Sequence, residues 1–344
     1  MYNGLRDCFR LEIEDDGPGT EATAVRIERI NSALYRIATP FDKTGTVFLY
    51  LVKGDRVALV DTGAVDSPRE VLEPALAEIG MGLSDVDLIL NTHAHLDHSG
   101  GNLETKRASG APIHVHASDL MMAQSTETQV EFHIAPLRVL EFPAETIQER
   151  ADYVIRNSGP AAGADVVLTD GEIVDLGAGV QLRVVHSPGH TPGHVCYYWE
   201  PEGVLISGDA IQGQGARPGS YPYYFNARDY RRSLMALAKL DIRTLCAGHA
   251  YIGGTLVNSP TRTGNGVAMF LQESVRVADS IHRAVTEAIR HKPGASKRDL
   301  AFAALSELIY SIPQLLVRQT GMPLHAGPAL VAHIDAALEG SYPA

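Results

Sequence analysis

Four ionisable side chains fall within six residues of one another: His93, His95, Asp97 and His98. His93 and His95 are two residues apart, so on an extended segment their side chains share one face. Asp97 and His98 then fall at the expected turn into a helix. Their side chains can face a point next to the one that His93 and His95 face. Imidazole nitrogens and carboxylate oxygens both bind zinc, at about 2.0–2.2 Å. The spacing therefore predicts a loop that can serve two adjacent metal ions.

Four more acidic or imidazole side chains follow apolar runs typical of strands or lie in a rigid turn. They are Asp61, His190, Asp209 and His249. Glycine and proline flank His190 in residues 187–194, a setting that can hold an imidazole in one orientation. Side chains at strand ends project from a rigid scaffold, where binding residues concentrate. We expect these four side chains to join the histidine cluster.

In their order along the chain, these residues resemble the five motifs of the metallo-β-lactamase superfamily. Residues 92–98 match its HxHxDH motif, and the other four side chains match the remaining motifs, all within residues 25–250. The complete set of motifs is much more specific than HxHxDH alone. The resemblance implies an α/β fold of the four-layer αββα type. Within the superfamily, the chain looks most like the glyoxalase II and lactonase branch.

The resemblance also implies a role for each side chain. One metal is expected on His93, His95 and His190, and the other on Asp97, His98 and His249. Asp209 is expected to bridge the two metals, and Asp61 to orient a ligand histidine. Two zinc ions per chain fit these ligand types, and iron or manganese fit them as well. Asp97 is also expected to guide the proton of the attacking water.

The elements expected around these residues form two copies of strands followed by a helix, over residues 25–117 and 165–250. Strands that alternate with helices are typical of layered α/β proteins. Residues 118–162 have helical periodicity and are expected to form an inserted helical cap. The expected parts are an N-terminal extension over 1–24, a metallo-β-lactamase-like domain over 25–264 and a helical extension over 265–344.

The tyrosine-rich loop, residues 212–225, follows Asp209. It is expected to border the pocket, because it lies between two of the expected ligands. Tyr223 and Tyr224 are candidates for binding the substrate and for a catalytic hydrogen bond to its carbonyl or leaving group. Arg217 in the same loop is a candidate for binding a substrate carboxylate. His133 lies in the cap, where we expect an exposed position. A partly apolar cap favours a small organic substrate.

The composition narrows the choice of partners. The formal net charge is −12 and no basic patch is recognisable, so neither nucleic acid nor an anionic membrane is an expected partner. Three cysteines, an odd and low count, fit a reducing compartment, and residues 1–20 lack the pattern of a signal peptide. We therefore expect a cytoplasmic protein, with a homodimer left open as its oligomeric state.

The expected chemistry is hydrolysis. A hydroxide shared by two metals would attack an ester-type bond directly, without a covalent enzyme intermediate. The expected substrate is a thioester, lactone or ester of a small organic molecule. A phosphodiesterase or nuclease of the same superfamily is the first alternative, and the acidic composition argues against it. A mononuclear-iron sulfur dioxygenase is the second alternative, and the presence of both Asp97 and His249 argues against it.

Overall fold

The described strands form one sheet of 13 strands that is divided into two halves. The computed structural model describes residues 27–41, 45–217, 220–253, 258–311 and 323–343, so the expected extension over 1–24 lies outside the described residues. The first half consists of β1 (Ile27–Arg29), β2 (Leu34–Phe41), β3 (Gly45–Lys53), β4 (Val57–Val60), β5 (Leu88–Leu90), β6 (Ile113–His116) and β7 (Val166–Leu168). The second half consists of β8 (Ile173–Asp175), β9 (Gln181–His186), β10 (Val195–Trp199), β11 (Val204–Gly208), β12 (Thr244–Ile252) and β13 (Asn258–Thr263).

The two halves meet face to face and share an apolar core. Val52 and Val60 from the first half belong to the same buried cluster as Val184, Tyr197 and Ile206 from the second. Strands β10 and β11 are buried along their whole length, as their continuous apolar runs predict. Strands β3 and β12 connect the halves through one residue pair, Val47 opposite His249. The two half-sheets therefore join at His249, which is one of the expected metal ligands.

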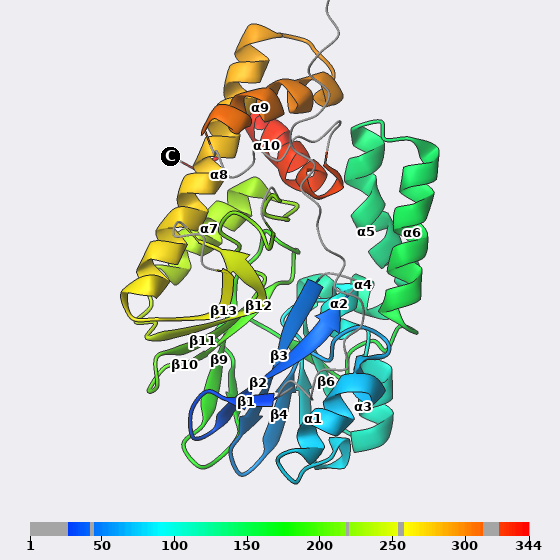
Figure 1. Ribbon diagram of the computed structural model, residues 1–344, viewed down its shortest axis with the longest axis vertical. Coiled ribbons are helices and arrows are strands. Elements are labelled where there is room, and N and C mark those ends of the chain that lie inside the picture. The colour runs from blue at the N-terminus through cyan, green and yellow to red at the C-terminus, as the bar shows by residue number, and fades with distance from the viewer. Residues whose placement is uncertain (1–26, 42–44, 218–219, 254–257, 312–322, 344) are drawn as a thin grey trace, which may run out of the picture.

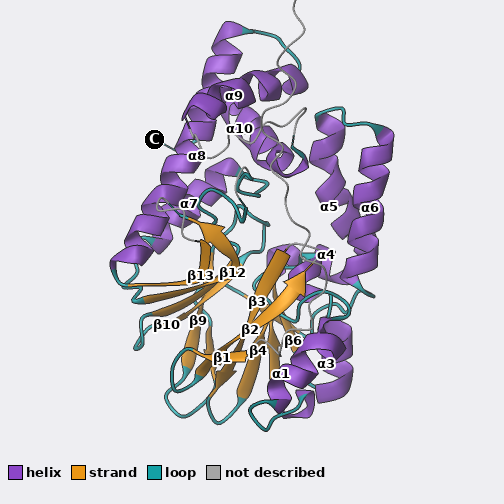
Figure 2. Cartoon of the chain, viewed as in Figure 1, coloured by secondary structure: helices purple, strands orange, loops and turns teal. Residues whose placement is uncertain are grey.

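Helices cover the outer face of each half, as Figures 1 and 2 show. The helical segment 68–77, a π-helical turn followed by α1 (Glu73–Ala77), buries Leu72 and Leu76 against the first half. Helices α7 (Ala227–Leu237) and α8 (Asn265–His291) pack against the outer face of the second half. The order helix, sheet, sheet, helix is the four-layer αββα arrangement that the sequence predicts.

Three helices occupy the stretch predicted as a cap: α4 (Leu120–Gln124), α5 (Thr126–Val139) and α6 (Ala144–Ser158). Ser125 caps the N-terminus of α5, because its hydroxyl accepts a hydrogen bond from the backbone N–H of Thr128. Helices α5 and α6 pack side by side and stand beyond the sheet edge near α2 (Leu96–Ser99) in Figure 1. This places the α5–α6 pair next to the helix that carries Asp97 and His98.

The C-terminal part is helical, as predicted for residues after 265. Helix α9 (Lys297–Ser311) packs on α8, and α10 (Gly327–Glu339) contacts α5, α7, α8 and α9. The C-terminal helices and the cap thereby close over the same end of the sandwich. Among the described residues, no helix combines the length and the apolar character needed to cross a bilayer.

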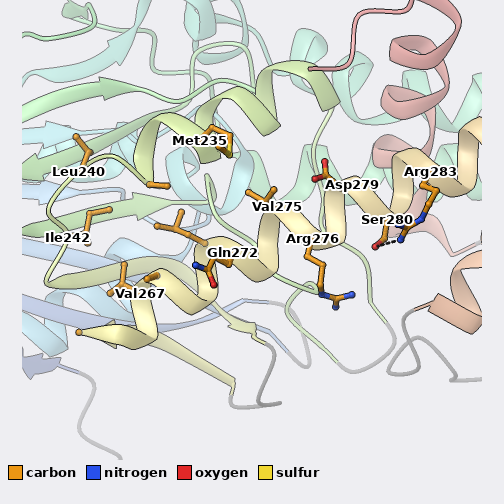
Figure 3. Close-up of a pocket in the computed structure, with 14 residues that line it drawn as sticks. Met235, Leu240, Ile242, Val267, Gln272, Val275, Arg276, Asp279, Ser280 and Arg283 are labelled. Carbon is orange, nitrogen blue, oxygen red and sulfur yellow. Dashed lines mark hydrogen bonds between the residues drawn. The ribbon is translucent and has the colours of Figure 1, made fainter. Parts of the chain in front are cut away.

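A cavity of about 670 Å³ lies between α7 and α8, on the outer side of the second half-sheet (Figure 3). Its lining is mainly aliphatic and includes Met235, Leu240 and Ile242, with Arg276 and Arg283 at its polar side. None of the predicted metal ligands lines this cavity. It is therefore separate from the site that the motifs define.

Candidate metal centre

The seven side chains predicted as metal ligands converge at one point. His93 and His95 follow the end of β5, and the extended backbone of His95 leads directly into α2, which carries Asp97 and His98. The other three side chains arrive from the second half of the chain: His190 from the turn before β10, Asp209 from the end of β11 and His249 from within β12. Six of the seven are buried, and His249 is half-buried.

Their nitrogen and oxygen atoms form three overlapping groups in which all atoms lie within 4.8 Å of one another. The groups are His93, His95 and His190; His93, His98 and Asp209; and Asp97, His98 and His249. The first and third groups coincide with the two ligand sets expected from the sequence. Nε2 of His93 lies 3.1 Å from Nε2 of His190, and Nε2 of His249 lies 3.1 Å from Oδ2 of Asp97.

The Asp209 carboxylate lies between the two sets. Its oxygens are 3.6 Å from Nε2 of His98, 3.5 Å from Nε2 of His190 and 3.5 Å from Nε2 of His249. The backbone N–H of Asp209 donates to Nε2 of His194, which fixes the residue from behind. A side chain at Gly248 would collide with the Asp209 carboxylate, so only glycine fits beside it.

Two of the imidazoles that face the cluster are held from their far side by backbone carbonyl groups. Nδ1 of His190 donates to the carbonyl oxygen of Tyr223 at 2.5 Å, and Nδ1 of His249 donates to that of Thr46 at 2.8 Å. A histidine that donates from Nδ1 presents the lone pair of Nε2 on its other side. Backbone contacts of this kind fix the tautomer and the ring orientation of metal-binding histidines.

Several polar atoms at the cluster have no hydrogen-bond partner among the described residues. They are Nε2 of His95, Nε2 of His98 and Oδ1 of Asp209, all buried. Buried polar atoms without partners are costly, and inward-facing imidazole and carboxylate atoms are the donors that zinc, iron and manganese accept. The donor set therefore fits two metal ions.

Burial and neighbouring charges set the protonation states of these donors. Burial acts to lower the pKa of His98 and His249, but the nearby carboxylates outweigh it and raise both pKa values, so a metal ion must displace a proton from these two imidazoles. Burial lowers the pKa of His93 and His95 well below the usual value, so both imidazoles stay neutral. Burial acts to raise the pKa of Asp97, but the neighbouring His98 and His249 outweigh it and lower the pKa. The pKa of Asp209 is lowered in the same way by His249 and His98. Neutral imidazoles and ionised carboxylates are the forms that coordinate metals.

A cavity of about 500 Å³ opens above the cluster. Its floor includes His95, Asp97, His190, Asp209 and His249, and its walls come from the cap, the tyrosine-rich loop and the C-terminal segment near His325. Arg217 lines the cavity from an exposed position, in agreement with its predicted placement in the pocket. A cavity of this volume suits a small organic molecule.

The structure separates the two predicted tyrosines. The Tyr223 ring lines the cavity, 6.3 Å from the His95 ring, and its hydroxyl lies 3.0 Å from Nδ1 of His133. Tyr224 points the other way, is fully buried, stacks on Tyr230 and hydrogen-bonds His333 through its hydroxyl at 2.7 Å. The prediction that Tyr224 contacts substrate is wrong, because adjacent residues of this extended loop face opposite sides.

His133 is also placed differently from the prediction. It is 3% exposed, and its ring lies 4.6 Å from that of His95. The packing of α5 over residues 92–98, the metal loop, brings His133 to this position. The helical pattern of the cap did not indicate which face of α5 would be covered. Arg150 of α6, which sequence analysis did not single out, lines the same cavity.

Two further side chains hold the site and were not predicted. Nε2 of Gln212 donates to the carbonyl oxygens of Tyr223 and Asp209, and its Oε1 accepts from the Tyr223 N–H. Asp119 accepts hydrogen bonds from the Ala94 and Gly193 N–H groups and from the Thr191 hydroxyl. Asp119 thus fastens the loop of His93 and His95 to the loop of His190. The only sign of Asp119 in the sequence was an acidic residue shortly after the expected strand Ile113–His116.

Comparison with known proteins identifies the class. Residues 42–249, more than half of the chain, match the sequence pattern of the Metallo-beta-lactamase superfamily, and the chain belongs to that superfamily. It is similar to a probable metallo-hydrolase, YqjP, of Bacillus subtilis, with 28% identity over 62% of this chain and 70% of that protein. It is also similar to a hydroxyacylglutathione hydrolase of Rhodospirillum rubrum, with 28% identity over 53% of this chain and 57% of that protein.

The human acyl-coenzyme A thioesterase MBLAC2 is 30% identical over a shorter region, 36% of this chain and 41% of that protein. This chain therefore spans about half or less of the length of the thioesterase and the hydroxyacylglutathione hydrolase. Among solved structures, the metallo-beta-lactamase family protein TTHA1429 of Thermus thermophilus superposes with a TM-score of 0.66 at 27% identity, over 91% of this chain and 95% of its own. These likenesses establish the fold and the superfamily.

Proposed function

We propose that this protein hydrolyses a thioester, lactone or ester of a small organic molecule, using two zinc ions held by the seven side chains of the cluster. One observation carries the proposal. Five imidazoles and two carboxylates converge in two sets at the floor of a cavity of about 500 Å³. Two zinc ions, when bound, would lower the pKa of a shared water towards neutrality and polarise a substrate carbonyl oxygen.

The chain's own residues supply binding and orientation. Asp97 and Asp209 place ionised carboxylates beside the cavity, where they can accept and hold a proton from the attacking water. The pKa of Tyr223 is raised by burial, so its hydroxyl stays protonated. It donates to Nδ1 of His133 in this structure and can turn to the substrate carbonyl or leaving group. The α5–α6 pair and the tyrosine-rich loop shield the site from bulk water.

The thioesterase and hydroxyacylglutathione hydrolase relatives support an acyl substrate, because both names specify cleavage of a thioester-type bond. The acidic composition supports the same choice over a nucleic-acid substrate, since phosphate backbones are bound by clustered Lys and Arg.

A substrate panel tests the proposal. The zinc-loaded protein should hydrolyse at least one class among aryl esters, lactones and acyl thioesters, and metal analysis should find about two zinc ions per chain. Asp209→Asn should abolish this activity, while His291→Asn, at an exposed histidine of α8, should leave it unchanged. Activity on bis(p-nitrophenyl) phosphate alone would overturn the proposal in favour of a phosphodiesterase.

A further inference from the structure

Arg150 of α6 places a guanidinium in the active-site cavity without a carboxylate partner among the described residues. It is half-buried and lines the cavity together with Tyr223 and His133. Its Nη2 lies 3.3 Å from Nδ1 of His133 and 3.5 Å from the hydroxyl of Tyr223, and its guanidinium lies 5.1 Å from the centre of the Tyr153 ring. All these partners are neutral groups.

Such a setting is unusual for arginine inside a cavity. The guanidinium stays charged at any pH that proteins tolerate, and a charge partly removed from water is ordinarily balanced by an acid. Glu149 reaches the same cavity from an exposed position and forms no ion pair with Arg150 in the described part of the chain. The planar fork of donors is therefore available for a ligand, and carboxylates match its geometry with two parallel hydrogen bonds.

His133 adds a second donor. A guanidinium can only donate, so the contact with Arg150 makes Nδ1 of His133 an acceptor and places the ring proton on Nε2. Nε2 of His133 is buried and has no acceptor among the described residues. Arg150 and His133, which both line the cavity, thus carry two kinds of N–H donor on its cap side.

We propose that Arg150 and His133 form a carboxylate-binding subsite, so that the substrate carries a carboxylate in addition to its scissile ester-type bond. This inference rests on the proposed function for the identity of that bond. The His133 ring lies 4.6 Å from the His95 ring, so the carboxylate and the scissile carbonyl lie in one small molecule, a few bonds apart. A single guanidinium matches a single negative charge. Arg150 is accordingly a specificity-determining residue, and the product is a dicarboxylate when the carboxylate belongs to the acyl part.

Binding of simple acids tests the subsite without turnover. Glutarate and pentanoate have the same chain length and differ by one carboxylate, and their dissociation constants on the zinc-loaded protein can be measured by isothermal titration calorimetry. Glutarate should bind about 10- to 100-fold more tightly, the range for a charge-assisted pair of hydrogen bonds. Arg150→Gln should remove this preference. Arg156→Gln removes the same charge from an exposed position on the same helix and should retain the preference.

Arg150→Lys provides a second variant, because it keeps the charge but loses the planar fork. Its preference for glutarate should fall between those of the wild type and Arg150→Gln, and this comparison decides the question if the glutamine variant does not fold. Equal binding of glutarate and pentanoate by the wild type would overturn the subsite. A preference that survives in both Arg150 variants would overturn it as well.

Activity separates this inference from the proposed function. The ratio of kcat/KM for the glutaric acid half-thioester of thiophenol to that for its pentanoyl thioester should fall about 10-fold or more in Arg150→Gln. Hydrolysis of both thioesters with an unchanged ratio would reject the subsite and leave the hydrolase assignment intact. Hydrolysis of no thioester, lactone or aryl ester, with glutarate still bound through Arg150, would reject the proposed hydrolysis and leave the subsite intact.

Discussion

The Asp61 carboxylate lies 2.8 Å from Nδ1 of His98, and both groups are almost completely buried. The same carboxylate accepts hydrogen bonds from the backbone N–H of Thr92 at 2.7 Å and from its hydroxyl at 2.8 Å. Asp61 thus ties His98 to the start of the metal loop. Its backbone has a φ of 63°, in the left-handed region that non-glycine residues rarely adopt. Strain of this kind persists where surrounding contacts determine the conformation, as these three hydrogen bonds do.

Asp61→Asn is expected to weaken metal binding about 10- to 100-fold, the range found when the outer partner of a metal-binding histidine is removed. Asparagine tolerates the left-handed backbone, so the substitution tests the carboxylate rather than the turn. Competition for zinc with a chromophoric chelator measures the effect. Asp66→Asn changes an exposed carboxylate five residues away and serves as the control. Equal zinc affinity in wild type and Asp61→Asn would remove Asp61 from the metal site.

Tyr223→Phe is expected to lower kcat about 10-fold or more while the metal content stays the same. Tyr223 lines the cavity, whereas His190, a proposed metal ligand, contacts the backbone carbonyl of Tyr223, which the substitution keeps. Metal analysis beside steady-state kinetics separates these roles. An unchanged kcat would show that Tyr223 only forms part of the wall.

Tyr224→Phe removes the hydroxyl of the neighbouring tyrosine and serves as the matched comparison for Tyr223→Phe. The Tyr224 hydroxyl bonds Nε2 of the buried His333, so its loss leaves an imidazole nitrogen unpaired and should reduce the free energy of unfolding by about 1–3 kcal/mol. Turnover of the folded variant should be close to that of the wild type, because Tyr224 does not line the cavity. Urea unfolding and kinetics on the same preparations test both statements. A loss of turnover without a loss of stability would contradict the structure.

Asp119→Asn is expected to destabilise the fold by about 1–3 kcal/mol. All three contacts of the carboxylate are with donors, so an amide must place its own N–H₂ against one of them. Asp241→Asn, at an exposed carboxylate, is the control in denaturant unfolding. Because Asp119 joins the loop of His93 and His95 to that of His190, zinc affinity should fall together with stability. A variant as stable as the wild type would show that the two loops hold together without this side chain.

The site can be located from the sequence because its chemistry is local and the strands that position it are mainly apolar. Residues 92–98 carry four of the proposed ligands in one loop, and the mainly apolar runs that form β10 and β11 are fully buried. Strand β13, by contrast, is the polar segment Asn258–Thr263 at the outer edge of its half-sheet. The segment has no alternation of apolar residues that would indicate a strand. It is a strand only because it pairs with β12.

Long-range packing accounts for what was missed at the site. His133, Arg150 and Asp119 stand far in sequence from the ligands they accompany, and only the folded cap and the start of α4 bring them close. Tyr223 and Tyr224 were equivalent in the sequence, and the clamp of Gln212 on the Tyr223 backbone decides which ring faces the cavity. Hydrogen bonds of this kind depend on tertiary geometry that residue types and spacing do not encode.

Removal of the metals is expected to lower the thermal midpoint of unfolding, and zinc should restore it. A ligand that binds only the folded chain stabilises it by about 2.7 kcal/mol at a hundredfold excess over its dissociation constant. The gain should be larger with zinc, iron or manganese than with magnesium, because the cluster is rich in imidazole. Calorimetry of chelator-treated protein with each metal in turn measures these shifts. Asp209→Asn, which alters the carboxylate between both ligand sets, should reduce the zinc-dependent shift, and His291→Asn should keep it in full. A midpoint that responds equally to magnesium and zinc would contradict an imidazole-based metal centre.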